Sequence, residues 1–128
     1  MSTITIDNGN IAYHKKVASV ILDGAFCRTT GLDKTSGYMV YEIPYTQGMQ
    51  ISMRVNGGSC AGITFWDRLH DTVPTELETN GFLGYDNQGK GSSSEVTVSN
   101  YTPTNVPEGT TYVYLAFMKT KRKYVKIG

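Results

Sequence analysis

Regular alternation of apolar and polar residues between positions 35 and 55 constrains the fold of this chain more than any other feature of its sequence. In the second half of this segment every other residue is apolar, namely Met49, Ile51, Met53 and Val55. A period of two is that of a β-strand with one face buried and the other in water. Another apolar run covers residues 38–43, and Pro44 and Gly48 mark a turn between the two runs. The segment therefore predicts two strands of an antiparallel sheet.

Short apolar runs separated by turn dipeptides continue along the rest of the chain. The dipeptides are Asn8-Gly9, Asp23-Gly24, Asn56-Gly57, Asn80-Gly81 and Gln88-Gly89. The runs predict an N-terminal hairpin of residues 4–6 with 11–13, and strands near residues 17–22, 61–66, 82–85, 96–98, 111–118 and 124–127. No segment of a dozen residues has its apolar residues at helical spacing without a Gly or Pro interrupting it. We therefore expect an all-β fold, an antiparallel two-sheet β-sandwich or barrel of about nine or ten strands.

The alternation stops between residues 67 and 81, where DRLHDTVPTELETNG is typical of a long connection that carries function. A short helical turn over residues 74–78 is one possibility. Trp66, just before this connection, lies on the opposite strand face from Ile63 and Phe65. Its indole is therefore expected to face outward or into a second layer.

At 128 residues the chain is expected to form one domain, with an N-terminal hairpin over about residues 1–22 and a core sandwich over about residues 23–128. Its 12 basic and 11 acidic side chains give a net charge of +1, which argues against a nucleic-acid or membrane partner. Basic residues cluster near the C-terminus: Lys119, Lys121, Arg122, Lys123 and Lys126. Acidic residues gather before Asn87: Asp67, Asp71, Glu76, Glu78 and Asp86. We interpret the basic cluster as a candidate interface; a solvated strand end is the alternative.

The cysteines and the first residues bear on where the chain is made. Cys27 and Cys60 are the only cysteines, and without a CxxC motif or a His partner they are expected to be free core thiols. The first residues, MSTITIDNGN, lack the basic start and the apolar run of a secretion signal. We therefore expect synthesis in a cytoplasm and no membrane span.

Catalytic, nucleotide and metal motifs are weak throughout. Residues 84–90, GYDNQGK, match a phosphate-binding P-loop up to its last position, but Gly91 replaces the magnesium-binding Ser or Thr and a strand follows instead of a helix. His14 and His70 lie outside any nucleophile signature. Two carboxylate pairs could serve a glycosidase, namely Asp67 with Asp71 and Glu76 with Glu78. Three aspartates, Asp67, Asp71 and Asp86, could bind calcium. Acidic loop residues are common and a hydrolase of this size would need a deep cleft, and the aspartates do not match the spaced pattern of a calcium loop. No catalytic residue, metal or cofactor is therefore predicted.

Aromatic residues form the more informative set. Nine Tyr and one Trp are many for this length, and their flat apolar faces with polar tips suit sugar stacking and protein interfaces. Trp66, Asp67 and Arg68 combine a ring with an acceptor and a forked donor, and Tyr85 and Tyr101 are candidates to join them. These five residues are the candidate glycan contacts. The alternative is that Trp66 packs under the 67–81 connection.

Short motifs spread along the chain resemble a known family. They are SGY at 36–38, YEIP at 41–44, Gly48, FWD at 65–67, FLGY at 82–85 and VPEGTTY at 106–112. In this order they resemble a jelly-roll module of bacteriophage virion proteins, found in tail, baseplate and fibre components and similar to carbohydrate-binding modules. The resemblance covers about residues 30–118; the chain departs from it in having Trp66 where the pattern has Tyr, and in the long 67–81 insertion.

This resemblance implies a jelly-roll sandwich with one of two roles, host-glycan recognition or decoration of a capsid or tail, and carries over Trp66, Asp67 and Tyr85 as ligand contacts. We expect a non-enzymatic virion accessory protein, made in the host cytoplasm and located in the virion. Its expected partners are other virion proteins, further copies of itself as a trimer, and a bacterial surface polysaccharide. The alternatives are a stand-alone carbohydrate-binding protein and a small glycan hydrolase.

Overall fold

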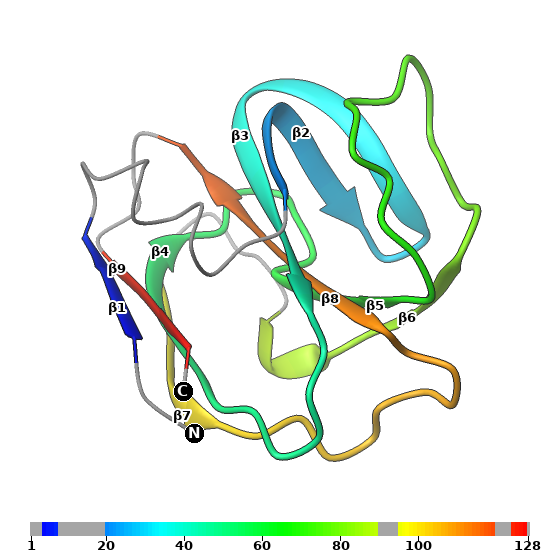
Figure 1. The fold of residues 1–128 in the computed structure, drawn as a ribbon. Helices are drawn as coiled ribbons and strands as arrows, with labels where there is room; N and C mark the ends of the chain where they lie inside the picture. The colour runs from blue at the N-terminus through cyan, green and yellow to red at the C-terminus, as the bar shows by residue number, and fades with distance from the viewer. Residues whose placement is uncertain (1–3, 8–19, 90–94, 120–123, 128) are drawn as a thin grey trace.

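The computed structural model describes residues 4–7, 20–89, 95–119 and 124–127, which form an all-β fold of antiparallel sheets (Figure 1). One sheet has the strand order β1 (Ile4–Asp7), β9 (Tyr124–Ile127), β4 (Ile51–Asn56) and β7 (Glu95–Tyr101). The other has the order β2 (Val20–Arg28), β3 (Gly31–Pro44), β8 (Tyr112–Met118), β5 (Ile63–Trp66) and β6 (Phe82–Tyr85). A short 3-10 helix, η1 (Asn87–Gly89), follows β6. The prediction of an all-β, antiparallel fold is confirmed.

The strand pairs are nested along the chain. β1 pairs with β9, β3 with β8, β4 with β7 and β5 with β6, and successive pairs alternate between the two sheets. β2 stands outside this series and extends the second sheet by pairing with β3. The two strands predicted over residues 35–55 therefore lie in different sheets, because the connection after Pro44 crosses from one sheet to the other.

Apolar side chains from both sheets meet in one core. β4 contributes Ile51, Met53 and Val55. β8 contributes Val113, Leu115 and Phe117. β3, β5 and β7 add Met39, Tyr41, Ile43, Ile63, Phe65 and Val98. On these strands the face that the sequence alternation assigned to the interior is buried, but on β5 and β8 the opposite face is buried as well.

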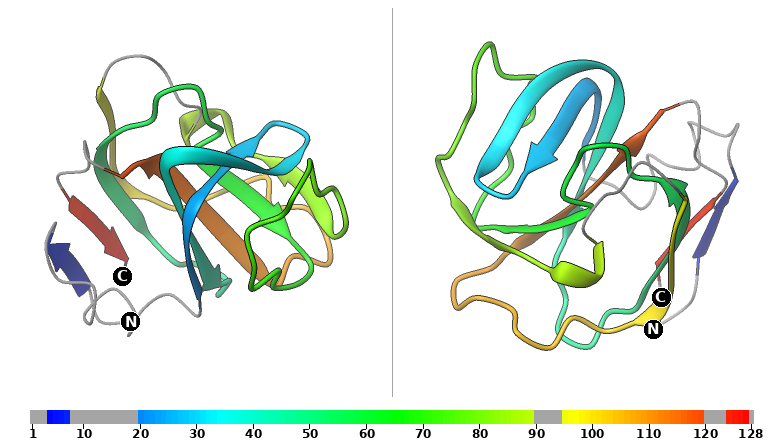
Figure 2. Two further views of the ribbon diagram at one scale, coloured as in Figure 1. Left: turned by 90° about the horizontal axis from the view of Figure 1, so that it is seen from above. Right: turned by 180° about the vertical axis from the view of Figure 1, so that it is seen from behind.

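A second core covers the outer face of the five-stranded sheet. It contains Trp66 and Tyr114 together with Leu22, Phe26, Leu32, Val40 and both cysteines. The 67–81 connection lies against the end of the β2–β3 hairpin, as Figure 2 shows from two sides. Leu32 and Glu78 exchange two backbone hydrogen bonds there, of 2.9 and 2.7 Å. The helical turn expected over residues 74–78 is wrong, because Glu78 is extended and paired with Leu32.

Two other local predictions are changed. Asp23-Gly24 is not a turn but a β-bulge inside β2, where Gly24 has a φ of +89°. For the N-terminal hairpin, residues 11–13 lie outside the described residues, and β1 pairs with β9.

Cys27 and Cys60 are buried and free, as expected. In the described part of the chain, no helix is long and apolar enough to cross a membrane.

Candidate functional site

Trp66 cannot be the exposed sugar platform that the sequence suggested. Its side chain is fully buried in the second core, stacked on Tyr114 with ring centres 4.6 Å apart. The indole N–H donates to Thr64 Oγ1 at 2.7 Å, and the rings of His70 and Phe82 meet it edge-on. Because the indole has no exposed face, the alternative interpretation holds: Trp66 packs beneath the 67–81 connection.

A buried glutamate holds this connection over Trp66. Glu42, on β3, is fully buried, and its two carboxyl oxygens accept hydrogen bonds from the backbone N–H groups of His70 and Asp71, at 2.7 and 3.1 Å. The Tyr114 hydroxyl donates to the carbonyl of Arg68 at 2.7 Å. Burial, with the nearby Glu42 carboxyl as a further cause, raises the pKa of Tyr114 and keeps the phenol protonated. These hydrogen bonds hold the 67–81 connection over the second core.

Asp67 and Arg68 form an exposed pair of their own. Arg68 Nε donates to Asp67 Oδ1 at 2.6 Å. The guanidinium holds the pKa of Asp67 below its ordinary value. Asp67 follows β5 at the end where Trp66 pairs with Phe82, whereas Tyr85 pairs with Thr64 further along the same ladder. The structure therefore does not bring Asp67 and Arg68 together with Tyr85 in one site.

Tyr85 and Tyr101 do come together. They line a pocket of about 360 Å³ whose other walls are Phe65, Asp86, Asn87, Gln88 and Asn105; we call this the Tyr85 pocket. It lies where β6 and η1 of one sheet edge meet β7 of the other sheet. Phe65 is buried and contributes apolar lining, and Tyr85 is 40% exposed, so part of its side chain is accessible to a ligand.

Asp86 is the fixed polar group of the Tyr85 pocket. Its Oδ1 accepts from the backbone N–H of Gln88 at 2.7 Å, and its Oδ2 accepts from the Tyr101 hydroxyl at 2.7 Å. Partial burial and the bond to Asp86 raise the pKa of Tyr101, so the phenol remains a donor at neutral pH. Both oxygens keep further lone pairs that can accept hydrogen bonds from a ligand.

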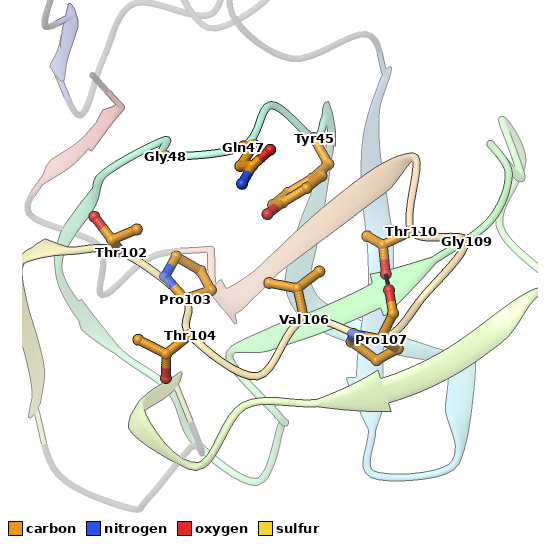
Figure 3. A pocket seen from close by; sticks show the side chains of 10 residues that line it. All are labelled: Tyr45, Gln47, Gly48, Thr102, Pro103, Thr104, Val106, Pro107, Gly109 and Thr110. Carbon is orange, nitrogen blue, oxygen red and sulfur yellow. Dashed lines mark hydrogen bonds between the residues drawn. The ribbon is translucent and has the colours of Figure 1, made fainter.

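A larger pocket of about 520 Å³ lies on the other side of the 101–107 segment; we call it the Tyr45 pocket. Figure 3 shows Tyr45 and Gln47 on one side of it and Thr102, Pro103, Thr104 and Val106 on the opposite side. Its remaining lining is Gly48, Pro107, Gly109 and Thr110. Both pockets have volumes in the range of small-molecule sites.

The basic residues near the C-terminus are only partly described. Lys119 forms an ion pair with Asp23, with Nζ 2.9 Å from Oδ1. Lys121, Arg122 and Lys123 lie outside the described residues. The backbone of Lys126 pairs with Thr5 and Ser52 inside the four-stranded sheet. Their expected role as an interface stays a prediction.

Sequence reasoning missed most of the polar lining of the Tyr85 pocket. Asn105 was not singled out, and Asn87 and Gln88 entered only through the P-loop match and the Gln88-Gly89 turn. Asp86 was considered in the same match, in an acidic region and as a calcium ligand. Their signal was the run Tyr85-Asp-Asn-Gln, an exposed ring followed at once by a carboxylate and two amides. Within the described residues, no group of three or more His, Cys, Asp or Glu side chains is placed to hold a metal ion.

Comparisons with protein-family models, with curated proteins and with solved structures found no match to this chain. The function must therefore be argued from the pockets, the strand arrangement and the motifs.

Proposed function

We propose that this chain is a non-enzymatic accessory structural protein of a bacteriophage virion, and that its Tyr85 pocket attaches it to a glycan of the bacterial surface. The observation that carries the binding role is an aromatic residue, Tyr85, that is 40% exposed in a pocket with Asp86, a carboxylate whose two oxygens are already hydrogen-bonded. The assignment to a virion derives from the motif resemblance over about residues 30–118.

The chemistry of the Tyr85 pocket suits a sugar. A pyranose presents a flat patch of C–H groups that packs on an aromatic ring, and a rim of hydroxyls that both donate and accept hydrogen bonds. Asp86 supplies acceptors, and the amides of Asn87, Gln88 and Asn105 supply donors and acceptors. Because Asp86 is held in place before a ligand arrives, little conformational entropy is lost on binding.

The strand pairing supports a jelly-roll sandwich as the finer fold. In a jelly roll a long antiparallel hairpin is wrapped so that its nested strand pairs alternate between two facing sheets. The pairs β1–β9, β3–β8, β4–β7 and β5–β6 follow this rule, with β2 as an addition beside β3. This agreement rests on pairing alone and is independent of the motifs.

The glycan role is tested by titrating the protein with purified bacterial surface polysaccharides and their oligosaccharide fragments in a calorimeter. We expect Tyr85→Ala to weaken binding by about tenfold or more, because it removes the stacking face. Leu77→Ala is the matched control, since Leu77 is 42% exposed and lies outside the Tyr85 pocket. Equal affinities for wild type and Tyr85→Ala would contradict the role.

Three further measurements address the rest of the proposal. Mass spectrometry of the oligosaccharide after long incubation should find its length unchanged, and shortening would favour the hydrolase alternative. Particles purified from the phage that carries the gene should contain the chain in a fixed ratio to the major capsid protein, and its absence would contradict the virion role. The proposed self-association as a trimer is measured by analytical ultracentrifugation of the 14.1 kDa chain.

A further inference from the structure

We infer that the Tyr45 pocket is a second sugar subsite, which receives an uncharged pyranose of the same oligosaccharide whose neighbouring unit occupies the Tyr85 pocket. This inference rests on the proposed glycan role and adds to it a ligand length and a charge class. Three observations carry it: the lining chemistry, the rigidity of the walls, and the segment that the two pockets share.

The lining of the Tyr45 pocket selects against charge. Among the described residues that line it, none carries a full charge at neutral pH. The ring of Tyr45 offers a flat apolar face, while Gln47, Thr102, Thr104 and Thr110 offer an amide and hydroxyls. Such groups can satisfy sugar hydroxyls, whereas a carboxylate or sulfate entering the pocket would lose water without gaining a counter-ion. The occupant that fits is therefore a neutral sugar.

Backbone hydrogen bonds hold the walls before any ligand binds. The Tyr45 N–H donates to the Thr111 carbonyl at 2.9 Å, which joins the two connections that form the walls. Thr110 donates through its hydroxyl and its N–H to the Pro107 carbonyl, at 2.7 and 3.3 Å. Tyr45 and Val106 also pack against the core. A pocket built on such fixed segments needs little ordering on binding.

The two pockets share one segment of chain. Within residues 101–107, Tyr101 and Asn105 line the Tyr85 pocket, while the intervening residues line the Tyr45 pocket. Tyr101 and Thr102, which are adjacent in the chain, therefore line different pockets. A ligand with linked units can therefore reach both pockets by crossing a single segment. Linking two weak contacts in this way raises affinity through effective concentration, with no new contact required.

The test uses a ladder of glucose- and galactose-based oligosaccharides, from monosaccharide to hexasaccharide, and a matching ladder that carries uronic acids. We expect the affinity of the wild type to rise about tenfold or more from monosaccharide to the longer neutral members, and less along the acidic ladder. Gln47→Ala removes the amide and Tyr45→Leu removes the aromatic face, and each should remove about threefold or more of that gain while leaving monosaccharide affinity unchanged. Gln50→Ala, exposed in the same connection but outside the described pocket linings, is the control.

The outcomes separate the two proposals. If Tyr85→Ala abolishes binding but affinity does not increase with length, the glycan role stands and the second subsite is overturned. A gain with length that survives in the Gln47→Ala, Tyr45→Leu double variant also overturns it. The NMR signal of the Gln47 side-chain amide reports directly on sugar binding in the Tyr45 pocket. A shift of this signal with neutral sugars in the Tyr85→Ala protein supports the subsite even if the Tyr85 pocket binds no sugar. No shift with any member of either ladder overturns the inference.

Discussion

Glu42 shows how one residue can organise a region that its sequence neighbours do not mark as special. It stands in the apolar run of β3, yet its fully buried carboxyl group accepts backbone hydrogen bonds from His70 and Asp71. Asp71 has a φ of +73°, a conformation that is uncommon for a residue other than glycine. The hydrogen bond from Asp71 is therefore one of the contacts that hold the 67–81 connection in this shape.

Replacing Glu42 by Gln is predicted to destabilise the protein by roughly 1–3 kcal/mol, because one amide hydrogen-bond donor then faces a backbone N–H in a buried site. Urea unfolding followed by the fluorescence of Trp66, which lies beneath the same connection, measures the change. Glu76→Gln is the control, since Glu76 is exposed in the same connection and its replacement should change stability by less than about 0.5 kcal/mol. Equal stability of the two variants would mean that Glu42 contributes no net stabilisation.

At the scale of elements, the docking of the 67–81 connection on the β2–β3 hairpin decides whether Trp66 is covered. The contact is close: a Cβ atom added at Gly31 would clash with the carbonyl oxygen of Glu78. Gly31 is thus required by the approach of another backbone, whereas most turn glycines of this chain are required by a positive φ. The sequence around Gly31 carries no sign of this partner, which lies far along the chain.

Gly31→Ala is predicted to push the connection away from the hairpin and to destabilise the protein by roughly 1–3 kcal/mol, as overpacking does in a fixed core. Limited proteolysis should cut the 67–81 segment faster in this variant than in the wild type. Ser36→Ala, at an exposed position of the same strand, should leave both stability and cutting rate unchanged. Unchanged proteolysis of Gly31→Ala would mean that the connection adjusts without detaching.

At the scale of the whole molecule, both cysteines and Tyr114 bind their protons more tightly in the folded than in the unfolded chain. Burial raises the pKa of Cys60 from 9.0 to about 12, and it also raises those of Cys27 and Tyr114. Since these folded-state pKa values are raised, the unfolded chain releases protons first as pH rises. The stabilising contribution of the neutral groups is complete below about pH 9 and is lost progressively above it.

We predict that the urea midpoint of unfolding falls steadily between about pH 9 and about pH 12, the range set by the Cys60 shift. In Cys60→Ala the fall should be shallower, because one of the three groups no longer titrates. Thiol reagents at neutral pH should label the wild type only at the rate of unfolding. A midpoint that stays constant over this pH range, or labelling of the native protein within mixing time, would contradict the burial argument.

Much of the fold could be predicted from the sequence alone because its signals are local. The period of two in residues 49–55 and 111–118 identified strands and the face of each that enters the core between the two sheets. Asn56-Gly57 and Asn80-Gly81 identified real turns, and in the second of them Gly81 has a φ of +86°, a backbone angle that other residues avoid. These properties depend on a residue and its immediate neighbours, so a single sequence contains them.

Only the tertiary structure decided how the strands pair and which aromatic residues reach the surface. Trp66 and Tyr85 are indistinguishable by local pattern, yet one is fully buried and the other is 40% exposed, because the 67–81 connection folds back over only the first. Tyr85 and Tyr101 share a pocket because β6 and β7 meet at the edges of two sheets. Such contacts join residues distant in the chain, and their free energy depends on the whole packed arrangement, which local alternation does not encode.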